Sequence, residues 1–245
     1  MNPPFQATAP GIPNASRWNK DLGLAWADVF QEQKLDRKAT VLEIGPGFTD
    51  KIAFGLAALN FCGRVILVDP CEAARCWAVA RYRRLLPHAK VHSVRNPIPD
   101  STVLDGQSID AVVSNHIFDD ILLNISVPRA KSLQLFSVMR PDMPCSSLFL
   151  ESWKHLISEP TRLEMLTPRV IDDFIKYLNS VQPRFVAVNH YPSWRHYQYG
   201  LDAIDNYSLR IIRELHQRIG NGPITYTDRI GTEQIGTICW LVAKL

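Results

Sequence analysis

The sequence predicts an α/β fold, in which helices cover both faces of a doubly wound, mostly parallel sheet of seven strands. Two observations carry this prediction. Short runs rich in β-branched residues are apolar throughout rather than alternating, which is typical of parallel strands buried on both faces. Helical stretches separate these runs in strict alternation, as successive βαβ units require.

The elements of the first two thirds of the chain can be placed in order. Ser16 is a candidate N-cap for a helix that runs to about Lys34 and has apolar residues at helical spacing on one face. The predicted strands are 40–44, 64–69, 89–94, 109–114 and 147–150. The predicted helices between them are 50–61, 71–86 and 128–139.

The second part of the chain departs from this alternation. Thr167 and Pro168 read as an N-cap and a first-turn proline, which predicts that a helix begins there. Further strands are predicted at 184–190 and 237–244, which completes the count of seven.

The long segment between the last two strands, residues 191–236, is predicted to be an insertion that forms a lid, with a helix near 203–219. We expect residues 1–37 to be an N-terminal arm and helix that cover one domain formed by residues 38–245.

The composition is that of an ordinary globular protein. The hydrophobic fraction is 46%, the charged fraction 21% and the net charge +3, which gives only weak support to a nucleic-acid partner. Five cysteines form no CxxC pair, and neither a signal peptide nor a run of about twenty apolar residues is found. We therefore expect a cytoplasmic protein that does not enter a membrane.

Residues 41–50, VLEIGPGFTD, predict a strand that feeds a tight glycine turn and then a helix. A dinucleotide-binding turn would have a third glycine where Asp50 stands, and a carboxylate there repels a pyrophosphate. Glu43 and Asp50 instead favour a ligand part that is cationic. Asp69 ends the second strand, where an acidic residue is expected to bind the hydroxyls of a ribose. S-adenosylmethionine has both chemical features.

These stretches resemble the motifs of the class I S-adenosylmethionine-dependent methyltransferases. The first motif stands here as Glu43-Ile44-Gly45-Pro46-Gly47, with Thr49 where a third glycine is often found. The second motif matches VILVDP, and SIDAVVSNHIFDD is similar to the fourth strand and the loop after it. The resemblance covers roughly residues 38–190 and the last strand. It implies a Rossmann-like fold whose last strand, 237–244, is antiparallel to 184–190.

The resemblance also implies a set of cofactor-binding residues. An acidic first motif would orient the methionine end of S-adenosylmethionine, the glycines would let the backbone approach it, and the second motif would hold the ribose. Asn96 departs from the family's usual Asp and is equally explained as a turn residue before a proline. The residues assigned in this way are Glu43, Gly45, Gly47, Asp69, Pro70, Asn96, Ser114 and Asn115.

The loop after the fourth strand indicates the kind of acceptor. Enzymes that methylate adenine in ribosomal RNA share the EIGPG turn but carry an Asn-(Pro/Leu)-Pro-Tyr loop, whereas this loop is Asn-His-Ile-Phe and has no tyrosine to stack on a base. We therefore predict a small-molecule acceptor, methylated on nitrogen or oxygen, and no nucleic-acid partner. A base is needed only for an alcohol, a phenol or a protonated amine. The candidates are Glu151 at the end of the strand at 147–150, His116 and Asp119, although the last two are also explained as loop and capping residues.

An aromatic segment at 190–199 supplies candidate acceptor-binding residues. Such a segment can exclude water and hold a flat or cationic acceptor, or it can form the packed core of a lid. The candidates are His190, Tyr191, Trp194 and Tyr197, with Trp18 and Trp153 completing the enclosure. No metal site is predicted.

Two other functions remain open from the sequence. The enzyme could transfer or cyclise the aminocarboxypropyl arm of S-adenosylmethionine and release methylthioadenosine, because the same cofactor-binding residues serve this reaction and methyl transfer. The chain could also be a non-catalytic cofactor-binding subunit, and a homodimer is possible in either case.

Overall fold

The central sheet of the computed structural model has the strand order β3-β2-β1-β4-β5-β7-β6. The structure describes residues 15–95, 108–137, 146–191, 196, 199–220, 225–230 and 233–245. The strands are β1 Thr40–Ile44, β2 Arg64–Val68, β3 Lys90–Val94, β4 Ala111–Asn115, β5 Phe185–His190, β6 Thr225–Ile230 and β7 Glu233–Lys244. Strands β1 to β5 pair in parallel, and β7 is antiparallel to both β5 and β6. The mostly parallel sheet and the antiparallel last strand are thus confirmed.

Eight helices are present in the described part of the chain, and none of them is long and apolar enough to cross a membrane. They are α1 Ala15–Glu32, α2 Lys51–Ala58, α3 Glu72–Leu85, α4 Phe118–Ser126, α5 Arg129–Ser137, α6 Ser147–Ile157, α7 Pro160–Val181 and α9 Ala203–Ile219.

Six of the predicted strands are present, but the prediction of a strand at 147–150 is wrong. These residues begin α6, because Ser146 caps the helix by accepting a hydrogen bond from the backbone N–H of Phe149 at 3.2 Å. A four-residue apolar run cannot distinguish a strand from a buried helix segment, and only the packing of α6 decides. The edge strand β6 was not predicted.

The predicted start of the long helix at Thr167 is also wrong. Helix α7 begins at Pro160, which occupies its first turn, and Pro168 lies inside the helix. The Thr167 hydroxyl donates to the carbonyl of Leu163 at 2.8 Å instead of capping a helix end. A helix can therefore contain a Thr-Pro pair that resembles a start signal.

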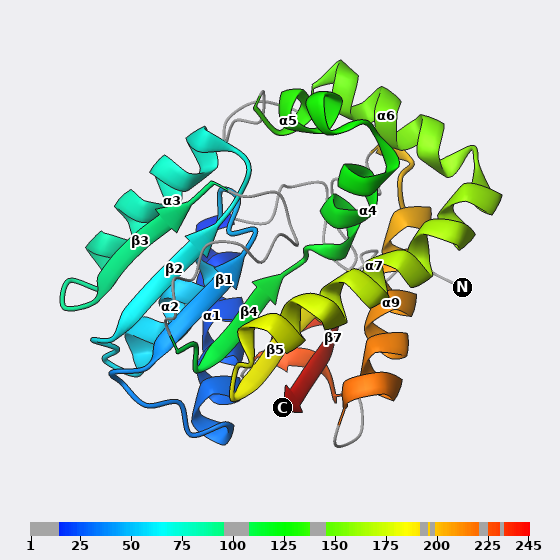
Figure 1. Ribbon diagram of the computed structural model, residues 1–245. Coiled ribbons are helices and arrows are strands. Elements are labelled where there is room, and N and C mark those ends of the chain that lie inside the picture. Colours follow the sequence, from blue (N-terminus) through cyan, green and yellow to red (C-terminus); the bar gives the residue numbers. More distant parts are fainter. Residues whose placement is uncertain are drawn as a thin grey trace.

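Two layers of helices enclose the sheet. Helices α1 and α2 lie behind it and α7 crosses in front of β5 (Figure 1). Alternate strand residues face the two layers: Val41 belongs to the core beneath α1, α2 and α3, and Leu42 to the core beneath α4, α7 and α9. Helix α1 is part of the first core, since Trp26 is fully buried and packs edge-on against Trp240 of β7 with ring centroids 4.9 Å apart.

Two glycines allow α1 and α2 to cross closely. A Cβ atom added to Gly23 would lie 2.4 Å from Cβ of Phe54, and one added to Gly55 would lie 2.7 Å from Cβ of Trp26. Both distances are shorter than any real contact, so the crossing requires glycine at both positions. The close contact brings the N-terminus of α2, and with it the glycine turn, against the sheet.

The insertion at 191–236 contributes to the core as well as to any lid. Helix α9 packs its buried face, with Ile204, Ile211 and Leu215, into the same core as α7. Strand β6 extends the sheet beyond β7. Trp194 and Tyr197, two of the predicted acceptor-binding residues, lie outside the described residues.

Trp153, which we predicted to bind the acceptor, is fully buried in the core among α6 and α4 residues. Replacing it by alanine is expected to lower the free energy of unfolding by about 3–5 kcal/mol, because a large cavity opens in a packed core. The measurement is denaturant unfolding at equilibrium, with Met165→Ala as the control, since Met165 is 67% exposed. A loss below about 1 kcal/mol would place Trp153 outside the packed core.

Candidate functional site

A pocket opens at the edge of the sheet where β1, β2 and β4 end. It is lined by Gly45, Gly47, Asp69, Pro70, Ile117 and Asp120 among others. Gly45 and Gly47 adopt left-handed backbone angles, with φ of 63° and 54°, which other residues rarely adopt. A Cβ atom added to Gly47 would meet nothing within 4 Å, so the turn presents bare backbone to open space. Four of the predicted cofactor residues therefore meet in one pocket.

Asp69 is oriented by backbone groups of the two turns beside it. Its Oδ2 accepts a hydrogen bond from the Gly47 N–H at 3.1 Å, and its Oδ1 accepts one from the Cys71 N–H at 2.7 Å. Burial raises the pKa of Asp69 to about 6, although these hydrogen bonds oppose the shift. Each carboxylate oxygen has a second acceptor site, so Asp69 can still bind a hydroxyl group.

Glu43 faces the protein rather than the pocket. It alternates with Leu42 along β1, so its side chain meets α3, where the Tyr82 hydroxyl donates to Oε2. Burial raises the pKa of Glu43 to about 8, because the carboxyl is only 2% exposed. At neutral pH Glu43 keeps its proton and lacks the charge that we expected to attract a cationic ligand part.

Asp50 is likewise used within the protein. Nε of Arg81 donates to its Oδ2 at 2.8 Å and Nδ2 of Asn19 donates to its Oδ1 at 2.8 Å. The arginine neutralises the negative charge of Asp50, which we expected to attract a cationic part of the ligand. Asp50 thereby ties α1 and α3 to the start of α2.

Of the remaining predicted cofactor residues, the structure describes Ser114 and Asn115. Ser114 is fully buried and its hydroxyl donates to the carbonyl of Ile44 at 2.8 Å, so it joins β4 to β1 and does not line the pocket. Asn115 ends β4, and its Nδ2 donates to the Tyr191 hydroxyl at 3.2 Å. Asn96 lies outside the described residues.

A second group of side chains, the histidine–aspartate cluster, lies beside this pocket. It consists of His116, Asp119, His190, His196 and Asp205. His116 follows β4 with a left-handed φ of 59°, Asp119 lies in the first turn of α4, His190 ends β5, and Asp205 lies in the first turn of α9. The cluster joins segments that are far apart in the sequence.

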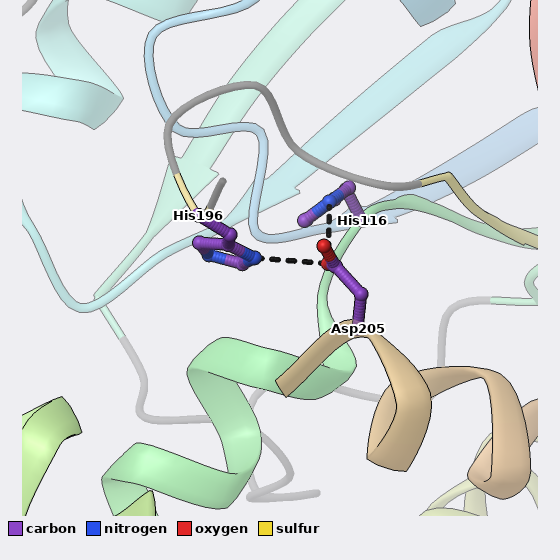
Figure 2. Close-up of side chains that lie close together, drawn as sticks. All are labelled: His116, His196 and Asp205. Atoms are coloured by element: carbon purple, nitrogen blue, oxygen red, sulfur yellow. Dashed lines mark hydrogen bonds and ion pairs between the residues drawn. The ribbon is translucent and has the colours of Figure 1, made fainter. Parts of the chain in front are cut away.

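Asp205 is the centre of the cluster. Its Oδ1 lies 2.9 Å from His196 Nδ1, 3.0 Å from His190 Nε2 and 3.8 Å from His116 Nε2. Figure 2 shows the rings of His116 and His196 directed at this carboxylate from two sides. Asp119 forms a second bridge, since its Oδ2 lies 3.2 Å from His116 Nδ1 and 3.4 Å from His196 Nε2.

The two carboxylates fix the charge of the cluster. Burial opposes a charge on His116, but Asp119 and Asp205 outweigh it and raise the pKa of His116 to about 10. Burial likewise opposes the charge on Asp119, but His116 and the other histidines lower its pKa to about 2. Burial and the His116 cation lower the pKa of His190 to about 4. The carboxylates thus favour the protonated form of His116, and its role as a base stays a prediction.

Tyr191 and Lys51 connect the cluster to the glycine turn. The Lys51 ammonium donates to the Tyr191 hydroxyl, and the Tyr191 ring lies 4.8 Å from the His116 ring. Burial raises the pKa of Tyr191, but the Lys51 and His116 charges outweigh it and lower the value to about 8. Lys51 is the first residue of α2 and was missed, because a lysine after a turn is usually exposed.

The other predicted site residues lie apart from this arrangement. Glu151 is exposed on α6, so its expected place at the end of a strand is wrong. Trp18 belongs to α1, and its side chain is outside the described structure. His196 and Asp205 were missed as site residues. The aromatic segment that contains His196 and the helix that contains Asp205 were both predicted, but nothing in the sequence indicated that these two residues meet.

The buried carboxyl of Glu43 predicts a pH effect on stability. Its pKa rises from the ordinary value of 4.5 to about 8 on folding, so between these values the folded protein binds one more proton than the unfolded chain. Stability should then fall as the pH rises, by about 1.4 kcal/mol per pH unit for one such group. We expect Glu43→Gln to flatten the dependence of the unfolding free energy on pH between 5 and 8. The exposed Glu32→Gln serves as the control, and parallel curves for wild type and Glu43→Gln would contradict this assignment.

The fold can be compared with known proteins. No protein-family model matches the chain, and no curated protein sequence matches it. Two similar solved structures are the DszA and CurJ carbon methyltransferases, each with a TM-score of 0.50 and with 10% and 9% identity. They align over 96% and 92% of this chain, which spans only about half the length of each. A candidate rRNA methylase from Clostridium thermocellum aligns over 96% of this chain and 100% of its own, with 15% identity and a TM-score of 0.48.

At these identities the likeness concerns the fold alone. The order of the strands, with β7 antiparallel to β5, is that of a Rossmann-like fold, which is what the chain has in common with these structures.

Proposed function

We propose that this protein is an S-adenosylmethionine-dependent methyltransferase that acts on a small molecule. One observation carries the proposal: the left-handed glycine turn after β1 and the Asp69 carboxylate after β2 line the same pocket. This is the arrangement in which a Rossmann-like sheet binds a nucleoside, since parallel strands present their carboxyl ends and turns at one edge.

The residues of the pocket fit S-adenosylmethionine. The bare backbone at Gly47 permits close approach, and Asp69 retains acceptor sites for the ribose hydroxyls. Burial together with Asp119 and Asp69 raises the pKa of Asp120 well above its usual range, which favours the protonated form of this pocket carboxyl. The cofactor would supply a methyl group activated by a sulfonium. The roles of Glu43, Pro70, Asn96, Ser114 and Asn115 stay predictions.

The acceptor is proposed to be small because the cluster next to the pocket is enclosed. Asp119, His190, His196 and Asp205 are buried, so an acceptor must pass into the protein to reach them. A base in a nucleic acid would first have to leave its stack. The loop after β4 also lacks the proline and tyrosine of enzymes that methylate adenine in RNA.

The chain's residues would align an acceptor nitrogen or oxygen and exclude water, as displacement at a methyl group requires. The Tyr191 hydroxyl bonds to Lys51 at the start of α2 and to Asn115 at the end of β4, and its ring lies 4.8 Å from that of His116. Trp18, Trp194 and Tyr197 stay predicted acceptor contacts, and a homodimer stays possible.

Asp69→Ala is expected to weaken binding of S-adenosylmethionine and of its thioether product about a hundredfold, because charge-assisted hydrogen bonds to the ribose are lost. Calorimetric titration measures both affinities. Asp172→Ala removes an exposed carboxylate of α7 and should leave them unchanged. An Asp69→Ala affinity equal to that of wild type would remove Asp69 from the binding site.

The nucleoside product distinguishes the two reactions that the same cofactor-binding residues permit. Methyl transfer yields S-adenosylhomocysteine, whereas attack on the aminocarboxypropyl arm yields methylthioadenosine. We expect S-adenosylhomocysteine when the protein is incubated with S-adenosylmethionine and a low-molecular-weight cell extract, and none with an RNA fraction. Chromatography of the nucleosides measures the result. Methylthioadenosine formed by the protein alone favours the alternative reaction, product only with RNA contradicts the small-molecule acceptor, and binding without any product favours a non-catalytic subunit.

A further inference from the structure

We propose that the histidine–aspartate cluster binds one divalent transition-metal ion, with His116, His196 and Asp205 as its ligands. The ligand atoms of these three side chains lie within 4.8 Å of one another, and they come from the loop after β4, from the segment before α9 and from α9 itself. Figure 2 shows both rings facing the same carboxylate.

The spacing of the atoms suits a common ion. Ligands at about 2.0–2.2 Å from a metal lie roughly 3.0–3.4 Å from one another in tetrahedral or octahedral geometry. His196 Nδ1 and Asp205 Oδ1 are 2.9 Å apart, and His116 Nε2 and Asp205 Oδ1 are 3.8 Å apart. All three ligand atoms lie within 4.8 Å of one another, so binding of an ion requires the two histidine nitrogens and the carboxylate oxygen to converge further.

The other residues of the cluster orient these ligands. Asp119 Oδ2 lies beside the second ring nitrogen of both imidazoles, at 3.2 Å from His116 Nδ1 and 3.4 Å from His196 Nε2. A carboxylate in this position fixes the tautomer and the direction of a ligating histidine. His190 Nε2 lies 3.0 Å from Asp205 Oδ1 and holds that carboxylate in the same way.

Unpaired buried atoms give independent support for a ligand. His116 Nε2, Asp119 Oδ1 and His190 Nδ1 have no hydrogen-bond partner among the described residues, although His190 is fully buried and Asp119 is 6% exposed. Buried polar atoms are nearly always satisfied in proteins. His116 Nε2 is one of the three proposed ligand atoms, so a bound ion would supply the partner that it lacks.

The donors identify the class of ion. Two imidazole nitrogens and one carboxylate oxygen suit Zn²⁺, Fe²⁺ or Co²⁺, whereas Mg²⁺ and Ca²⁺ prefer sites made of oxygen alone. Three protein ligands leave coordination positions open for an exogenous oxygen or nitrogen.

The position of the site gives the ion a role, which rests on the proposed function. Asp120 lines the pocket, and its neighbour on α4, Asp119, contacts His116 and His196 of the cluster. An acceptor hydroxyl or amine bound to the ion would lie next to this pocket. The ion would favour loss of the acceptor's proton to water. The acceptor atom would then bond to the methyl carbon as the carbon–sulfur bond breaks, and the sulfonium would become a thioether.

The test is titration of tag-free, chelator-treated protein with Zn²⁺, Co²⁺ and Mg²⁺ by calorimetry, with the visible absorption of bound Co²⁺ as a second readout. We expect one Zn²⁺ or Co²⁺ per chain, Co²⁺ bands typical of nitrogen ligands, and no comparable binding of Mg²⁺. His196→Ala and Asp205→Asn should each weaken Zn²⁺ binding at least tenfold and abolish the increase in Tm that Zn²⁺ causes. His155→Ala removes an exposed histidine of α6 and should change neither.

Several outcomes would overturn the proposal. Absence of Zn²⁺ and Co²⁺ binding to the wild type would do so, as would variants that are folded by circular dichroism and bind Zn²⁺ as the wild type does. If a ligand variant fails to fold, Asp119→Asn provides the test, since loss of the orienting carboxylate should weaken Zn²⁺ binding about tenfold. Unchanged binding in that variant would contradict the assigned geometry. Zn²⁺ binding by a protein that does not bind S-adenosylmethionine would refute the proposed function and leave the metal site intact.

Discussion

The parallel pairing of β1 with β2 and β4 is the constraint on which the rest of the molecule depends. In a parallel sheet the carboxyl ends of neighbouring strands lie at one edge, so the turns that follow them become neighbours. Gly45, Asp69 and His116 follow three different strands and reach the same region for this reason alone. The parallel pairing of β4 with β5 places His190 at the same edge, where Asp205 of α9 contacts it.

The cost of this arrangement is an unusual number of ionisable groups in the interior. Burial of a charge is tolerated only where a partner or a proton compensates it. Asp50 has an arginine, Glu43 keeps its proton beside Tyr82, and Asp205 is surrounded by imidazoles. In the histidine–aspartate cluster, His116 Nε2, Asp119 Oδ1 and His190 Nδ1 have no hydrogen-bond partner among the described residues.

The pocket and the cluster differ in their chemistry. The pocket combines the glycine turn and the carboxyls of Asp69 and Asp120 with a mostly apolar lining, which would suit a nucleoside. The cluster is built from imidazoles and carboxylates on four separate segments, which suit an ion or a polar acceptor. The segment after β5 supplies both the core helix α9 and two residues of the cluster, His196 and Asp205.

The sequence alone determined the parts that depend on local pattern. Apolar runs indicated seven strands, of which six are present, and the spacing of glycine and acidic residues located the pocket; neither needed knowledge of distant contacts. Only the tertiary structure decided that 147–150 is helical, that Glu43 turns toward Tyr82, and that His196 and Asp205 meet His116. The physical reason is that the packing partners of a side chain decide whether its segment is a helix or a strand and whether an ionisable group is charged. They also decide whether a residue belongs to a ligand site or to the core. Those partners come from segments whose separation along the chain carries no periodic signal.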